Sequence, residues 1–289
     1  MAPSEKFVLY SSAVSQWAMV PQLGLIEKGY KPDEYEVKEL DLLGAGNFDV
    51  DYLAINPNGT IPSLTAPSLK KPIIESAEIL TYLDRLHPDS GAQLTPKDEE
   101  TQAISQKLID LVHSDAVGTN LVLLTARDGE EFRAKQSGMF KGWIGTRQKV
   151  LEQNHAQYPE HVFYGPKALE NGALNDLYTS TEIGPGHEAF FAQSRDGYQV
   201  FAKSVDELDS LIVLPYAAGN EVTLADLNIV PWLAHAMWGA GATEVGDFGP
   251  LETLVKKSVP GFVVGDKIRK WWSTFGERES FKTVYPHLH

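Results

Sequence analysis

The sequence contains no cysteine among its 289 residues. This absence excludes disulfide bonds, cysteine-ligated zinc, iron–sulfur clusters and every mechanism that needs a cysteine nucleophile. Positive charge is also scarce, because 25 Lys and Arg stand against 39 Asp and Glu, which gives a formal net charge of −14. Since nucleic-acid binding needs a basic surface, we expect no nucleic-acid partner.

Long hydrophobic runs are missing as well. No stretch approaches the roughly 20 apolar residues of a membrane-spanning helix, and the opening MAPSEKFVLYSS is neither a basic leader nor an apolar segment. We therefore expect a cytoplasmic protein with no membrane partner. His187-Glu188 lacks the second histidine of the helical zinc motif, and Gly44-Ala45-Gly46 lacks the third glycine of a dinucleotide-binding loop. We expect no metal and no prosthetic group.

Residues 1–87 alternate between short apolar strands and helical patterns. Strands are predicted at 6–10, 35–42, 61–64 and 72–74, where the residues are apolar and β-branched or aromatic. One helix starts near Trp17 and stops at Gly29, and Pro21 lies inside it; a second helix begins at Glu75-Ser76. The order strand–helix–strand, then strand–strand–helix, predicts a compact α/β domain.

Residues 96–289 are predicted to form an all-helical domain, after a linker rich in Pro, Gly, Ser and Asp. Thr223 and Asp226 have the spacing of a capping box at the start of one helix. Residues 158–187 are rich in Gly, Pro and Asn with little periodicity, which predicts an extended insertion. Helical spacing covers 101–125, 140–153, 198–214, 224–238 and the residues from 268 to 275.

Four stretches together resemble the cytosolic glutathione transferases. They are LYSSAVSQWAMVPQLGLIEKG, NPNGTIP, IESAEILTYL and TLAD, and they occur in the order that this family has. The ending WWSTFGERESFKTVYP is similar too. The resemblance implies a thioredoxin-like N-terminal domain followed by an all-helical domain. It also implies a glutathione S-transferase that acts in detoxification, usually as a homodimer, with glutathione as cosubstrate.

The resemblance also implies where the peptide part of glutathione binds. Pro62 stands where the thioredoxin-like fold has a cis-proline, which exposes the backbone of Ile61 for pairing with glutathione; an ordinary loop proline is the alternative. Ser76 would donate to the γ-glutamyl carboxylate at a helix N-terminus, unless it only caps its own helix. Glu75 would meet the γ-glutamyl amine, and Asn47 the glycyl end.

The glutathione thiol needs a hydrogen-bond donor that favours its thiolate form. Ser15 lies fourteen residues before Gly29, which is the offset of the active-site serine or cysteine in theta-, tau- and omega-like family members. A hydroxyl at the first turn of a helix stabilises a thiolate through a charge-assisted hydrogen bond and the helix dipole. We expect Ser15 in this role, with Ser12 and Ser11 as alternatives because the helix start is not fixed by sequence alone.

The second substrate is expected to be a hydrophobic electrophile. Trp17, His113 and Leu121 are the predicted lining of its pocket, although each also suits plain core packing. The family's frequent Lys in the NPNG turn is replaced by Thr60, and no basic residue stands early in the first helix. These departures keep open a non-catalytic ligand-binding protein of the same fold, and glutathione-dependent ether or halide cleavage also remains an alternative. The lack of cysteine argues against deglutathionylation.

Overall fold

The computed structural model describes residues 6–289, which form two compact units. The first unit combines the chain up to residue 38 with residues 61–122 and 197–289. The second unit combines residues 39–60 with residues 123–196. Each unit is therefore built from segments far apart in the sequence, and the predicted domain boundary between residues 87 and 96 stays a prediction.

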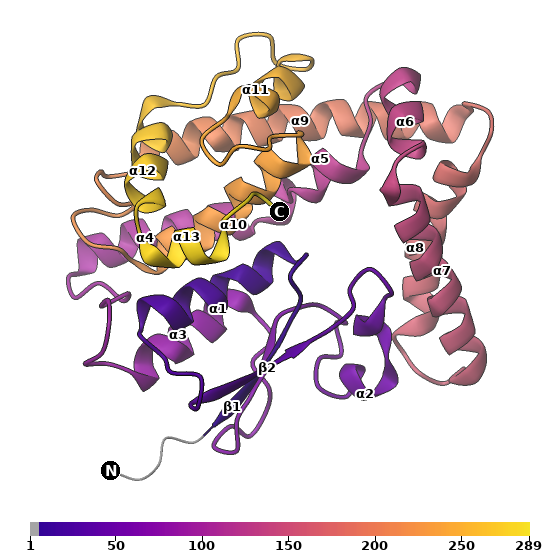
Figure 1. Ribbon diagram of the computed structural model, residues 1–289. Helices are drawn as coiled ribbons and strands as arrows, with labels where there is room; N and C mark the ends of the chain where they lie inside the picture. Colours follow the sequence, from indigo (N-terminus) through magenta and orange to yellow (C-terminus); the bar gives the residue numbers. More distant parts are fainter. Residues whose placement is uncertain (1–5) are drawn as a thin grey trace. The chain divides into compact units, whose positions relative to one another are not determined.

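A three-stranded sheet organises the N-terminal part of the first unit (Figure 1). Its strands are β1 (Phe7–Ser11), β2 (Tyr35–Glu39) and β3 (Ser63–Thr65), in the order β2-β1-β3. β3 pairs with β1 in antiparallel register, Leu9 opposite Leu64. The expected fourth strand at residues 72–74 is reduced to one bridge between Leu64 and Ile73.

Two helices pack beside this sheet, α1 (Gln16–Glu27) and α3 (Ser76–Leu86). Both were predicted, and Pro21 lies inside α1 as expected. After α1 the chain turns at Gly29, whose φ of 68° favours glycine. The apolar residues that join sheet and helices are Phe7, Leu9, Leu25, Leu64, Ile79 and Leu83.

The remainder of the first unit is helical, as predicted. α10 (Leu224–Gly239) packs against α1, α3 and α4 (Glu99–His113). The predicted capping box is confirmed, with Thr223 and Asp226 bonded reciprocally at the start of α10. The other elements of this part are η2 (Asp115–Val117), α11 (Gly249–Lys256), α12 (Asp266–Gly276) and α13 (Glu279–Val284).

The second unit contains η1 (Gly46–Phe48), α2 (Val50–Leu53), α6 (Gly129–Gln136), α7 (Met139–Gln157) and α8 (Tyr164–Thr179). α7 and α8 lie side by side (Figure 1). The buried Tyr164 hydroxyl donates to the Phe48 carbonyl at 2.8 Å, and Asn154 donates to the same carbonyl at 3.1 Å. These bonds hold residues 46–48 against the two helices.

The expectation of irregular structure at residues 158–187 is wrong, because α8 occupies 16 of these residues; that the segment is an insertion stays a prediction. Helix α8 buries Tyr164 and Tyr178 near its two ends. Asn171 in its middle donates to the Ile144 carbonyl and to Gln148 on α7. Pairing with α7 therefore stabilises a helix whose own apolar pattern is weak.

Two further helices differ in extent from the expectation. The pattern over 101–125 divides into α4, η2 and α5 (Asn120–Leu124), and α9 (Pro185–Leu211) begins well before residue 198. α5 and α9 each run across the border between the two units. Over residues 6–289, no helix combines the length and apolar character required to cross a membrane.

Candidate functional site

Ser15 occupies the N-cap position of α1, in the short turn that follows β1. Its backbone is extended, with φ −103° and ψ 114°, and its side chain makes no capping hydrogen bond. The hydroxyl instead donates to the Ile61 carbonyl at 3.4 Å. Because a bond of this length is weak, the half-buried hydroxyl is free to turn to a better acceptor.

The two alternative serines lie deeper. Ser11 is fully buried at the end of β1, where its hydroxyl accepts from the Gln22 amide at 3.0 Å. Ser12 is 4% exposed, and its carbonyl accepts the Ser15 N–H at 3.0 Å. Of the three serines, only Ser15 combines partial exposure with a position at the helix start.

Ile61 and Pro62 lie next to Ser15, joined by a cis peptide bond, as the sequence predicted. β3 begins directly after them and pairs with β1. Ile61 is 6% exposed, and its N–H has no hydrogen-bond partner among residues 6–289. This N–H is therefore available to a peptide that lies along the segment.

Glu75 and Ser76 open α3, as predicted, with Glu75 as N-cap and Ser76 as first helical residue. The Glu75 side chain makes no capping hydrogen bond, so the first-turn N–H groups of α3 keep their bonding capacity. Ser76 is 4% exposed, whereas Glu75 is exposed. A carboxylate is favoured at such a helix start by the free N–H groups and the helix dipole.

Trp17 and His113 are brought together from α1 and α4. Their rings stack with centroids 4.1 Å apart and an angle of 21°. His113 Nε2 lies 2.8 Å from Asn228 Oδ1, and burial holds the pKa of His113 below its usual value. The nearby Glu75 charge acts in the opposite direction on that pKa. The ring pair therefore joins α1 to α4.

A polar chain that the sequence did not reveal joins α1 to the helical part of the first unit. The Thr119 hydroxyl donates to Gln16 Oε1, and it lies 2.8 Å from His235 Nδ1. Thr119 is fully buried and His235 is 7% exposed. Gln16 lies 103 residues from Thr119 and 219 from His235 along the sequence, so no local pattern could have indicated this contact.

Two other predicted site residues have contacts of their own. Leu121 lies in α5 and packs against Gly197 of α9, where an added Cβ would meet its Cδ1 at 2.7 Å. Asn47 belongs to the second unit, where its Nδ2 donates to the Gly59 carbonyl at 2.6 Å. Its buried Oδ1 has no partner among residues 6–289. Both predicted contacts with substrates stay predictions.

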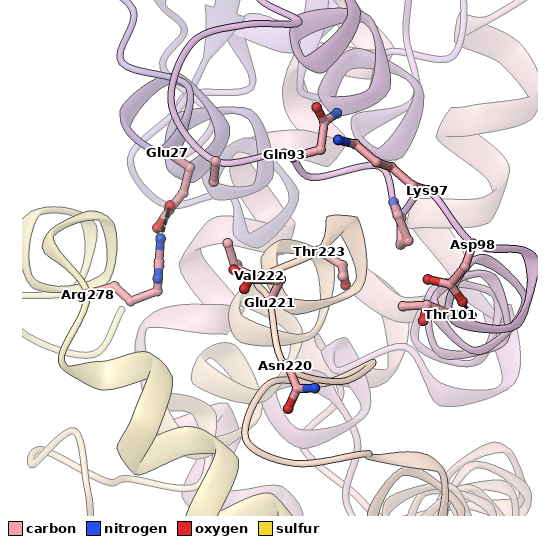
Figure 2. A pocket seen from close by; sticks show the side chains of 12 residues that line it. Glu27, Gln93, Lys97, Asp98, Thr101, Asn220, Glu221, Val222, Thr223 and Arg278 are labelled. Atoms are coloured by element: carbon pink, nitrogen blue, oxygen red, sulfur yellow. Dashed lines mark hydrogen bonds and ion pairs between the residues drawn. The ribbon is translucent and has the colours of Figure 1, made fainter.

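A hollow of about 610 Å³ lies elsewhere in the first unit (Figure 2). It is lined by the end of α1, residues 92–98 and the residues before α10. Glu27 and Arg278 form an ion pair at its wall, and Asp98 and Lys97 add one charge of each sign. None of Ser15, Ile61 and Ser76 lines it. Over residues 6–289, no three acidic or histidine side chains are grouped closely enough to hold a metal ion.

Known proteins resemble this chain in sequence and in fold. Residues 9–91 match the family described as "Glutathione S-transferase, N-terminal domain". Glutathione S-transferase Z1 of Arabidopsis thaliana is 34% identical over 110 residues, which cover 38% of this chain and only 47% of that protein. Glutathione S-transferase 1 of Dianthus caryophyllus is 23% identical over 252 residues, covering 87% of this chain and 86% of that protein.

Among solved structures, the beta-etherase LigF from Sphingobium sp. strain SYK-6 superposes with a TM-score of 0.62. The identity is 18%, and the match covers 97% of this chain and 98% of LigF, so this likeness establishes the fold alone. The predicted thioredoxin-like domain followed by a mostly helical part is thereby confirmed. Residues 9–91 therefore match the N-terminal domain family of the glutathione S-transferases, and the chain has the fold of solved glutathione transferases.

Proposed function

We propose that this protein is a glutathione transferase in which Ser15 holds the glutathione thiolate for attack on a hydrophobic electrophile. The observation that carries the proposal is the Ser15 hydroxyl, which caps no N–H of α1 and lies 3.4 Å from the Ile61 carbonyl. The Ile61 carbonyl is a weak acceptor for this hydroxyl, and the glutathione thiolate can replace it. Glutathione would be a cosubstrate rather than a resident group.

The peptide of glutathione has suitable partners beside Ser15. The unpaired Ile61 N–H would pair with its backbone, in the manner of an added strand. The first turn of α3, with Ser76, would receive the γ-glutamyl carboxylate, and Glu75 the γ-glutamyl amine. The first unit contains all four residues, Ser15, Ile61, Glu75 and Ser76. Trp17 and His113 would present a stacked apolar surface to the electrophile.

The proposed reaction needs the bound thiol to ionise near neutral pH. The thiol of free cysteine has a pKa of about 8.5, so lowering it by about 2 units takes about 2.7 kcal/mol of preference for the thiolate. One hydrogen bond to a charged group contributes about 1.5–3 kcal/mol. Ser15 together with the dipole of α1 can therefore supply the required stabilisation.

One specific observation favours a second reaction of the same site. The superposed LigF is a beta-etherase, which makes glutathione-dependent cleavage of an ether, with loss of an alkoxide or phenoxide, the second candidate. The same thiolate would attack, and only the leaving group differs. A non-catalytic ligand-binding role is the third candidate function. The proposal of a transferase also includes a homodimer, a cytoplasmic location and a role in detoxification.

Calorimetric titration of the full chain with glutathione tests the proposal. We expect saturable binding at or below millimolar concentration, and binding with no turnover of any electrophile would favour the non-catalytic reading. No heat of binding at millimolar glutathione would contradict the transferase and the cleavage reaction together. Product analysis after incubation with aryl halides and aryl ethers then distinguishes substitution from ether cleavage.

A further inference from the structure

Strand β2 is the least buried strand of the sheet. It lies at the sheet edge with β1 as its one neighbour, and residues 36–39 are all exposed, whereas β1 and β3 bury most of their residues. Because successive side chains of a strand point to opposite faces, β2 is uncovered on both faces. Over residues 6–289, no backbone hydrogen bond joins β2 to a residue outside the sheet. The outer backbone groups of β2 are therefore open to another strand.

The exposed side chains of β2 carry two opposite charges around one apolar residue. Glu36 and Lys38 are both exposed, and no ion pair among residues 6–289 includes either of them. Lys38 Nζ lies 5.5 Å from the centre of the Tyr10 ring of β1, so Lys38 lies over one face of the sheet. Glu36, two residues away, points to the same face. Val37 between them is 38% exposed.

This arrangement is self-complementary. In an antiparallel pair of two copies with the two-fold axis at Val37, Glu36 of each copy faces Lys38 of the other. Val37 then faces Val37, so apolar meets apolar at the axis. Side chains directly opposite each other share a face and have Cβ atoms about 4.5–5.5 Å apart, which suits ion pairs. An axis at Glu36 or at Lys38 would instead place two like charges opposite each other.

The opposite signs also decide between pairing and protection. Charged side chains on an edge strand usually keep a second strand away, and a charge of one sign would repel the same charge on a second copy. On β2 each charge would meet its opposite in the second copy, so these charges do not protect the edge against the chain itself. A two-fold contact needs a patch that is complementary to itself, and β2 meets this requirement.

We propose that two copies of this chain associate edge to edge through β2, antiparallel and centred on Val37, so that two three-stranded sheets become one continuous sheet. The inference rests on the homodimer that the proposed function includes, and it names the surface that forms it. The occupant of the edge is a second copy of this chain, because the charges of β2 fit their own two-fold image.

Reversing one charge of β2 tests the pairing. Glu36→Lys would place lysine opposite lysine twice in the dimer, and Lys38→Glu would place glutamate opposite glutamate twice. We expect either variant to raise the dissociation constant of the dimer about tenfold or more, measured by sedimentation of the full chain. The double variant restores both opposite pairs and should dimerise like the wild type. A dimer that survives either single reversal would lie on another surface and overturn the inference.

The matched controls for charge reversal are Glu207→Lys and Lys203→Glu on α9. They make the same changes of net charge at exposed positions of the first unit. Both should dimerise like the wild type, and a loss equal to that of the β2 variants would overturn the inference, because it would show an effect of net charge alone. A wild type that keeps the mass of one 31.9 kDa chain at every concentration would overturn it as well.

The lack of cysteine allows a second test that depends on position rather than charge. Val37→Cys introduces one thiol into a chain that has none, and the proposed axis brings it opposite its own copy. We expect mild oxidation to link this variant rapidly into a covalent dimer. Val200→Cys is the matched control, since Val200 is 39% exposed and lies on α9, and it should link far more slowly. Equal rates for the two variants would contradict an axis at Val37.

These outcomes are distinguishable from those of the proposed function. Both tests measure association without glutathione. A dimer that forms through β2 and binds no glutathione would contradict the proposed transferase and leave the β2 pairing established. A chain that transfers glutathione while it remains a monomer would overturn the β2 pairing and leave the role of Ser15 intact.

Discussion

At the residue scale, the polar side chains at the start of α1 obtain their partners from distant parts of the sequence. Ser15 meets Ile61 across 46 residues, and Gln16 meets Thr119 across 103. The start of α1 thus carries the Ser15 hydroxyl and the Gln16 amide, and both make tertiary hydrogen bonds. The chemistry expected of the site depends on these contacts being kept in the folded state.

His235 should make the stability of the protein depend on pH. Its pKa is about 4 in the fold and 6.5 in the unfolded chain, so the unfolded state binds a proton first as the pH falls. The contribution of the neutral His235 ring to the unfolding free energy is therefore complete above pH 6.5, and it is lost as the pH falls from 6.5 to 4. We expect the unfolding free energy of the wild type, from urea titration, to drop by about 2.5 kcal/mol more than that of His235→Asn between pH 7.5 and 4.5. Equal drops in the two proteins would contradict a buried neutral His235.

The site was predictable from sequence only in part, for a physical reason. The offset of Ser15 from Gly29 and the segments around Pro62 and Ser76 are local, so the printed residues contain them. Trp17 and His113 belong to separate helices, so the sequence predicted them only as the lining of a pocket and did not predict that their rings stack. Thr119 and His235 have no local signature, because their role arises from three-dimensional contact alone.

At the element scale, the start of α10 concentrates several buried hydrogen bonds on one carboxylate. Asp226 is fully buried and accepts from the Ala217 and Thr223 N–H groups and from Trp271 Nε1. The same side chain therefore ties α10 to the preceding loop and to α12. This arrangement explains why the capping pattern is visible in the sequence while the Trp271 contact is not.

Replacing Asp226 by alanine should destabilise the protein strongly. Three buried donors would lose their acceptor together, and we expect the unfolding free energy to fall by about 3–5 kcal/mol. Asp98→Ala is the matched control, because Asp98 caps α4 through the Thr101 N–H at an exposed position. Chemical denaturation of both variants should show a much smaller loss for Asp98→Ala. Similar losses would mean that the buried network around Asp226 contributes little.

Helix α8 illustrates what sequence patterns miss at this scale. Its apolar residues repeat only weakly with helical spacing, and its segment contains Gly, Pro and Asn, so the pattern predicted irregular structure. The fold compensates through hydrogen bonds to α7 and through two buried tyrosines. By contrast, α3 and α10 were predicted because their starts contain capping or family motifs and their buried faces are apolar.

At the scale of the whole chain, the first unit joins the beginning and the end of the sequence. Arg278 donates to Glu27 through Nε at 2.7 Å, and Ser280 donates to the same carboxylate at 2.5 Å. Glu27 lies at the end of α1, 251 residues from Arg278 (Figure 2). The Glu27 side chain is 5% exposed, so these partners replace the water that an exposed carboxylate would bind.

Removing the Arg278 side chain should leave the buried Glu27 carboxylate without its counterion. We expect Arg278→Ala to lower the unfolding free energy by about 3 kcal/mol, as for other broken buried ion pairs. Lys282→Ala breaks the exposed pair with Glu277 on the same stretch of chain and should leave the stability unchanged within error. Thermal unfolding of both variants checks this difference. A stable Arg278→Ala protein would show that the ion pair between Arg278 and Glu27 contributes little to holding the two ends together.

The acidity of the bound glutathione thiol tests most directly whether Ser15 holds the thiolate. Ultraviolet thiolate absorbance of the complex, followed against pH, should give a thiol pKa about 2 units below that of free glutathione. Ser15→Ala should raise this value by about 1–2 units, the equivalent of one hydrogen bond to a charged group. Ser12→Ala should leave it unchanged. A thiol pKa that is unshifted in the wild type, or equal in the wild type and Ser15→Ala, would contradict the role proposed for Ser15.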